Sequence, residues 1–214
     1  DFPTHAANGT FQSIYFTYYG DVFENLNFFD RLFPNIYKLV QHGNKIYVLS
    51  DRRDFYEYDL NLNLVTEYYL SSNAMDFDIY NDYIYFAYDN YSYSVWKVPL
   101  SNPEAPREAV IEWSSHVCGI CFDEGNQQFL VYNGSSTDNR PIRRYTTNWE
   151  LLSEDPTNLT SYSTLVYHNG DVFAGNQVLD SGMSNFRWTG SGHNIYGFIG
   201  DNYYVNNLGY LLPK

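Results

Sequence analysis

The sequence predicts an all-β protein, and within that class a β-propeller of short four-stranded blades. A turn rich in Gly, Asn or Asp is followed six times by a short aromatic and β-branched run, and successive runs begin about 31 to 45 residues apart, the spacing of a repeated small antiparallel sheet. The 214 residues include 23 Tyr and 15 Phe, which suit half-buried strands. Gly and Pro recur too often for long helices, and no window keeps a 3.6-residue apolar period.

This repeat favours six blades, with five as the alternative, in a single domain over residues 1–214. The six runs begin at Ile14, Ile46, Ile84, Phe129, Val172 and Tyr203. A two-sheet sandwich is the competing all-β architecture. It is disfavoured because sandwich strands need not repeat a four-strand unit with the same order of turns.

The second and third copies define the blade most clearly, because four runs divided by three turn signals predict a meander. In the second copy, strands are expected at 37–40, 46–49, 55–60 and 65–70. The third copy repeats this plan, with Pro103 and Pro106 interrupting its last connection. Its strands are expected at 75–80, 83–88, 94–100 and 108–113.

The remaining copies are less regular. Strands are expected at 117–122, 129–132, 142–145 and 149–152 in the fourth copy, at 164–167, 172–175, 178–179 and 185–188 in the fifth, and at 195–199, 203–205 and 210–212 in the sixth. The sixth copy lacks an obvious fourth strand. An open sheet edge exposes unpaired backbone groups, so residues 2–7 are a candidate outer strand that closes the ring; the alternative is an open array.

Two copies resemble a known family. Residues 84–89, Ile-Tyr-Phe-Ala-Tyr-Asp, precede residues 95–100, Val-Trp-Lys-Val-Pro-Leu, and residues 46–51 with 55–60 look like a second copy. Both are similar to blades of the six-bladed YWTD-type propellers of lipoprotein-receptor ectodomains and their bacterial relatives, although Tyr-Trp-Thr-Asp itself never appears intact. The resemblance implies a six-fold ring and a role in binding, and it carries no functional residue over.

Charge and composition exclude some partners and indicate a location. A net charge of -13 opposes binding to nucleic acid and to anionic membrane surfaces, and no apolar stretch is long enough to insert in a membrane. The chain begins with Asp1, which predicts a processed or excised form. Its Tyr-, Asn- and Ser-rich composition predicts an extracellular, secreted or cell-surface protein, with glycosylation sequons at Asn8, Asn90, Asn133 and Asn158.

Two carboxylates, Asp76 and Asp78, are predicted on one face of an innermost strand. Some five-bladed glycosidases carry paired acids there, one protonating the leaving group while the other activates water or attacks. If the protein is an enzyme, these are its catalytic candidates, with Glu124 or Asp51 as a further acid. The favoured interpretation is instead a solvated, ion-lined central channel.

Cys118 and Cys121 form a C-x2-C pair with His116 two residues earlier. Strand residues three apart point to opposite faces, so a shared metal or a disulfide would need a bulge at Gly119. Buried structural thiols are therefore favoured over a local disulfide and over metal binding. His42 and His168 fall in turns and are expected to be turn residues. We expect no metal site and no cofactor.

Exposed aromatic side chains are the remaining functional signal. Tyr88, Tyr91, Tyr93 and Trp96 cluster around one turn and form a candidate binding patch, since aromatic rings anchor interfaces and stack on sugars. The leading hypothesis is a non-catalytic extracellular propeller that binds protein or glycan, or that self-associates as a subunit of a surface assembly. The alternative is a carbohydrate-active enzyme that uses Asp76 and Asp78.

Overall fold

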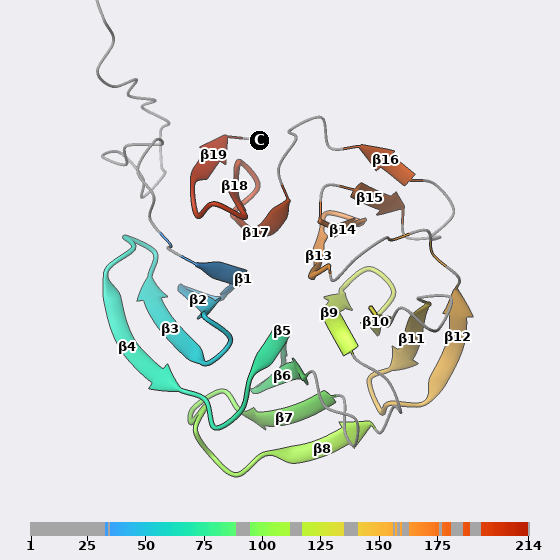
Figure 1. Cartoon of the computed structure of the whole chain (residues 1–214), viewed down its shortest axis with the longest axis horizontal. Helices are drawn as coiled ribbons and strands as arrows, with labels where there is room; N and C mark the ends of the chain where they lie inside the picture. The colour runs from blue at the N-terminus through green and yellow to red at the C-terminus, as the bar shows by residue number, and fades with distance from the viewer. Residues whose placement is uncertain are drawn as a thin grey trace, which may run out of the picture.

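A computed structural model describes residues 33, 35–88, 95–111, 117–134, 141–155, 157, 159, 163–175, 177–180, 186–188 and 194–213. These residues form five antiparallel sheets around a central axis, four with four strands and one with three (Figure 1). None of them is helical, and this part of the chain accordingly contains no helix that could cross a membrane. The prediction of an all-β propeller is confirmed, and the sandwich is excluded.

Each blade is a meander in which every strand pairs with the next one along the chain. Blade 1 contains β1 (Ile36–His42), β2 (Lys45–Ser50), β3 (Asp54–Asp59) and β4 (Leu64–Tyr69). Blade 2 contains β5 (Ala74–Tyr80), β6 (Tyr83–Tyr88), β7 (Val95–Pro99) and β8 (Glu108–Ile111). Blade 3 contains β9 (Val117–Asp123), β10 (Gln128–Asn133), β11 (Ile142–Thr146) and β12 (Leu151–Asp155).

Blades 4 and 5 are smaller. Blade 4 contains β13 (Leu165–His168), β14 (Asp171–Ala174), β15 (Gln177–Asp180) and β16 (Phe186–Trp188). Blade 5 contains β17 (Ile195–Ile199), β18 (Tyr203–Asn206) and β19 (Leu211–Pro213). Five of the six runs that predicted the repeat form second strands, namely β2, β6, β10, β14 and β18. The first run, at 14–16, and the candidate closing segment 2–7 lie outside the described residues.

The ring closes between the first and last blades. Each inner strand contacts the next in the order β1, β5, β9, β13 and β17, and β17 contacts β1. Glycines permit this junction, because a side chain at Gly197 would collide with the backbone oxygen of Leu39, and one at Gly209 with that of Phe33. The described blades therefore close into a ring of five. Five is the alternative that the sequence allowed beside the favoured number of six blades.

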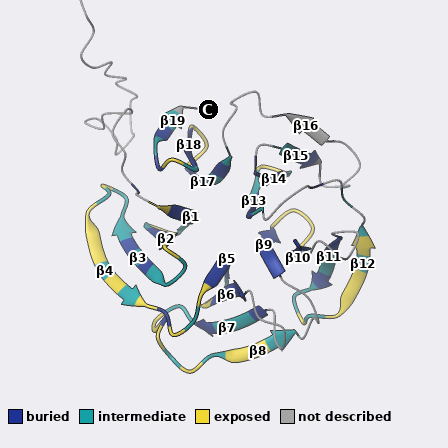
Figure 2. Ribbon diagram, viewed as in Figure 1, coloured by how far each residue is buried: buried dark blue, intermediate teal, exposed yellow. Residues whose placement is uncertain are grey.

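Aromatic side chains fill the wedges between neighbouring blades. Phe55 of blade 1 meets Phe77 and Phe86 of blade 2 edge to face, with ring centroids 5.0 and 5.4 Å apart. Between blades 2 and 3, the rings of Tyr85 and Phe129 lie 4.7 Å apart. Burial is strongest over the first two strands of each blade and weakest at the outer strands β4, β8 and β12 (Figure 2). Several of the described Tyr and Phe side chains thus pack between blades.

Candidate functional site

Four of the five inner strands carry a β-bulge at the same place. The ladder to the second strand skips Tyr37 in β1, Met75 in β5, Cys118 in β9 and Tyr196 in β17. In blade 4 the corresponding residue is Thr164, directly before β13. A bulged residue has no partner across the ladder and re-aims its side chain. All five residues line one pocket on the axis, named here the bulge-side pocket.

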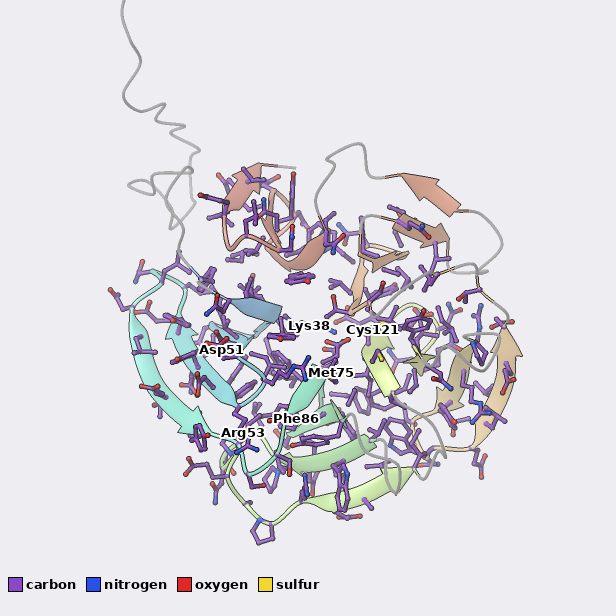
Figure 3. All side chains as sticks on the ribbon, viewed as in Figure 1. Lys38, Asp51, Arg53, Met75, Phe86 and Cys121 are labelled. Atoms are coloured by element: carbon purple, nitrogen blue, oxygen red, sulfur yellow. The ribbon has the colours of Figure 1, made fainter. Side chains whose placement is uncertain are left out.

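The residue after each bulge forms the next layer along the axis, and in blade 1 this residue is Lys38. Lys38 lies near the centre of the ring (Figure 3). Its side chain is only 1% exposed. Its Nζ donates to the backbone oxygens of Ile120, at 2.6 Å, and Leu165, and lies 3.2 Å from Asp76 Oδ1. All three ammonium hydrogens therefore have partners, and Lys38 joins blade 1 to blades 2, 3 and 4.

Asp76 is the corresponding residue of blade 2, and it is fully buried. Its Oδ2 accepts the N–H groups of Ile120 at 2.8 Å and Leu165 at 2.9 Å, and its Oδ1 accepts that of Phe77 at 2.8 Å. Burial raises the pKa of Asp76 to about 7, although the charge of Lys38 and the backbone N–H groups oppose this rise. With every acceptor direction occupied, Asp76 has no surface left for a substrate.

Asp78 lies two residues further along β5 and belongs to the same axial network. Its Oδ1 accepts the N–H of Ile79 at 2.7 Å, and its Oδ2 accepts that of Phe122 at 2.9 Å and lies 3.9 Å from Lys38 Nζ. Burial raises its pKa, and Lys38 opposes this. For Lys38 itself, burial lowers the pKa, but the two carboxylates outweigh burial and raise it. The two predicted acids are thus neighbours in a buried ion network.

The bulge-side pocket has a volume of about 350 Å³ and receives side chains from all five blades. Its lining consists of Tyr37, Arg52, Met75, Cys118, Ser163, Thr164, Gly175, Asn194 and Tyr196. Arg52 is the one charged side chain among these described lining residues, and its charge is positive. Its Nε donates to the hydroxyl of Tyr37 at 3.2 Å. It projects from the turn between β2 and β3, where its φ of 65° lies in the left-handed region.

Thr164 differs from the other polar groups of this pocket. It is 7% exposed, and its Oγ1 has no hydrogen-bond partner. Its neighbour Leu165 is fixed on both sides, since its N–H donates to Asp76 and its carbonyl accepts from Lys38. The axial network therefore fixes the backbone next to Thr164, a residue that lines the pocket and has an unsatisfied hydroxyl.

A second pocket, of about 290 Å³, lies at the opposite end of the axis, where the inner strands enter their first turns; we name it the turn-side pocket. Asp78, Glu124 and Asp201 line it, together with His42 and His168. The ring of His168 stacks on Phe198 with centroids 3.9 Å apart. Across the described ranges, no three His, Cys, Asp or Glu side chains are grouped to hold a metal ion.

The two cysteines are buried and are not disulfide-bonded, as the favoured interpretation predicted. The bulge falls at Cys118, and Cys118 lines the bulge-side pocket. Cys121 lies by Lys38, and burial raises the pKa of its thiol well above its usual range. At Gly119 between them, a Cβ would lie 2.7 Å from the backbone oxygen of Ser163, so the glycine allows blades 3 and 4 to approach closely.

The predicted aromatic patch is described only in part. Tyr88 is 4% exposed and belongs to the core between blades 1 and 2. The guanidinium carbon of Arg107 lies 5.0 Å from its ring centre and 4.6 Å from that of Trp96, which is half-buried. Both rings therefore serve packing around Arg107. Tyr91 and Tyr93 lie outside the described residues.

One predicted glycosylation site can be placed. Asn133 lies at the end of β10 with no exposed surface, a position that opposes attachment of a glycan to the folded protein. Asn8, Asn90 and Asn158 lie outside the described residues.

Sequence reasoning located Asp76 and Asp78 but missed Lys38, Arg52 and Thr164. Lys38 and Thr164 could have been found by aligning the inner strands of the blades with one another, instead of the second strands on which the repeat was recognised. In that alignment, Lys38 and Asp76 occupy the same position of adjacent blades. A cation and an anion at equivalent positions of neighbouring inner strands predict an ion pair. Arg52 gave no such signal, because an arginine in a turn is usually a solvated charge.

No protein-family model matches the chain, and no curated protein matches it. Among solved structures, the chain is similar to glutaminyl cyclase from Myxococcus xanthus, with a TM-score of 0.60 and 13% identity over 84% of this chain and 90% of that one. It is also similar to hydrazine synthase from Kuenenia stuttgartiensis, with a TM-score of 0.50 and 13% identity over 72% of this chain and 49% of that one. At these identities the likeness shows the propeller fold alone.

Proposed function

We propose that this protein is a non-catalytic, extracellular binding propeller whose ligand, a glycan or a protein segment, enters the bulge-side pocket. The observation that carries this proposal is the convergence of one bulged or equivalent residue from every blade on a single axial pocket. Ligand pockets are typically concave, with a few convergent polar groups on a rigid frame. Here the axial network supplies the frame.

The test is a screen of the intact protein against glycan and protein arrays. We expect at least one class of ligand to bind. A Met75→Trp variant, which places a bulky ring at the pocket, should lose that binding, whereas Tyr69→Ala, on the outer strand where Tyr69 is 62% exposed, should keep it. Loss of binding in the Tyr69 variant alone would place the binding surface on the outer face. The absence of a ligand from every array would overturn the proposal.

Self-association is a second version of the same binding function. The outer strands β4 and β12 expose apolar side chains, with Leu64 and Val65 53% and 54% exposed and Leu151 and Leu152 both 56% exposed. Exposed apolar groups on an open strand edge favour association with another chain. Sedimentation velocity over a range of concentrations tests this, and a Val65→Lys variant should shift any oligomer toward monomer.

A carbohydrate-active enzyme is the second candidate function, and one observation favours it. Asp78 and Glu124 both line the turn-side pocket, where two carboxyl groups can serve as acid and base in glycoside hydrolysis. Asp76 is excluded from contact with substrate because it is fully buried. Turnover on a glycan panel that disappears in Asp78→Asn and Glu124→Gln would support this candidate, and turnover independent of both acids would remove them from the reaction.

A further inference from the structure

We infer that the bulge-side pocket binds a sugar acid, a hydroxylated carboxylate about the size of one monosaccharide. This inference rests on the proposed function and adds to it the class of ligand and the groups that recognise it. Four features of the pocket carry it: its charge, its unsatisfied hydroxyl, its size and its aromatic walls.

The positive charge of the pocket favours an anionic ligand group, and a carboxylate is one that a guanidinium can bind through two parallel hydrogen bonds. Arg52 is the charged residue among the described lining residues. Its Nε is directed to Tyr37, and its terminal nitrogens make no hydrogen bond to the described residues. Those nitrogens are therefore available to a ligand, and a guanidinium matches the geometry of a carboxylate better than that of any neutral group.

The unsatisfied group of the pocket selects a ligand with hydroxyls. Thr164 Oγ1 is buried without a partner, and such a group costs free energy until something bonds it. A ligand hydroxyl can both donate to it and accept from it. Tyr37 also retains a proton to donate, because its oxygen is the acceptor in the bond from Arg52.

Size and shape favour a single sugar ring. A volume of about 350 Å³ lies at the lower end of ligand pockets, which span roughly 300 to 1,000 Å³. Tyr37 and Tyr196 come from blades 1 and 5, which are neighbours in the ring. Their rings supply flat apolar surface with a polar end, which suits the face and edge of a sugar.

The axial network sets the orientation of the ligand. The layer directly beyond the bulged residues holds Lys38 and Asp76, with Asp78 also beside Lys38. One cation faces two acids there, so the network carries a net negative charge when both acids are ionised, and a carboxylate placed deep in the pocket would face that charge. Like charges at short range are unfavourable. The acid group is therefore expected beside Arg52, and the neutral hydroxyl-bearing face beside Thr164.

The experiment is calorimetric titration of the intact 214-residue chain with D-glucuronate and D-galacturonate. D-glucose and D-galactose serve as probes that lack the carboxylate, and lactate as a carboxylate that lacks the ring. We expect both uronates, or one of them, to bind more tightly than the matching neutral sugar by about 10-fold or more, because a charge-assisted contact is lost in the latter. Lactate should bind more weakly than either uronate.

Matched variants locate the contacts. Arg52→Gln should weaken uronate binding by about 10-fold or more, and Thr164→Val, which keeps the shape and removes the hydroxyl, by about 5-fold. Arg53→Gln is the control on the neighbouring residue. Arg53 is directed to Asn73, with 2.7 Å between Nε and Oδ1, and points away from the axis (Figure 3); its loss should leave affinity unchanged.

Each outcome decides the inference. Uronates that bind no better than neutral sugars, or binding that survives Arg52→Gln, would overturn it. If the arrays yield a ligand and no uronate binds, the proposed function stands and this ligand class fails; if the arrays also yield nothing, both fail. Circular dichroism checks that each variant is folded. If Arg52→Gln unfolds, Arg52→Lys replaces it, because lysine keeps the positive charge but lacks the planar guanidinium.

Discussion

At the scale of single residues, Lys38 is the cation that faces both buried acids of the axis. Replacing Lys38 with Met should lower the free energy of unfolding by about 3–5 kcal/mol, because it leaves Asp76 and Asp78 buried without their cation. Chemical denaturation followed by circular dichroism measures this. The same substitution at Lys97, whose partner Glu108 is 70% exposed, should cost less than about 1 kcal/mol. Equal effects at both positions would mean that the axial network contributes little.

The same network predicts an unusual dependence of stability on pH. Burial raises the pKa of Asp76 to about 7, above its value of 3.8 in the unfolded chain, and it raises the pKa of Asp78 in the same direction. Between these two values the folded protein holds more protons than the unfolded protein, so stability falls as pH rises from about 4 to 7. The folded state should therefore be more stable at pH 5 than at pH 7.5.

Urea denaturation at the two pH values tests that dependence. An Asp76→Asn variant is less stable at both, since its amide cannot accept every N–H that the carboxylate accepts, but its stability should change less between them. A wild-type protein that loses stability on acidification from pH 7.5 to pH 5 would contradict the prediction.

At the scale of elements, the junction of β1 and β17 depends on a glycine. Gly197→Ala would place a methyl group against the backbone oxygen of Leu39 and 2.8 Å from its Cβ. Backbone cannot yield as a side chain does, so we expect a loss of about 1–3 kcal/mol. Gly43→Ala is the comparison, because its methyl group would meet nothing within 4 Å while its φ is +60°. Its loss of folding free energy therefore reports the left-handed backbone alone, at about 1–2 kcal/mol. Thermal denaturation ranks the two variants.

The strands could be predicted from the sequence, but the closure of the blades into a ring of five could not. Short runs of aromatic and β-branched residues that follow turn signals located β2, β6, β10, β14 and β18, since these features are local to each strand. Blade number depends on which inner strands meet, and at β17 and β1 that contact is made by glycine and backbone, which leave no hydrophobic pattern. Lys38 was missed for a related reason. It is one charged residue among the apolar residues of β1, and only its pairing with Asp76 of the next blade shows its role.

At the scale of the whole molecule, the axial network should make the ring unfold as one unit. Lys38 and Asp76 bond to one another and to backbone groups of blades 3 and 4, and blade 5 packs against blade 1. Linear repeat arrays unfold progressively from their ends, but a closed ring has no end. We expect a single transition in urea, with coincident curves from far-ultraviolet circular dichroism and tryptophan fluorescence. Two separated transitions would show that the blades unfold independently.

The bulges also bear on how such a protein can change. Tyr37, Met75, Cys118 and Tyr196 occupy positions that the strand ladders skip, and Thr164 precedes its strand. Substitutions there alter what the pocket presents without removing a cross-strand pair, while the ions one layer below hold the blades in place. The molecule thus separates a fixed frame from five exchangeable positions, one per blade, through which a new specificity can evolve or be designed.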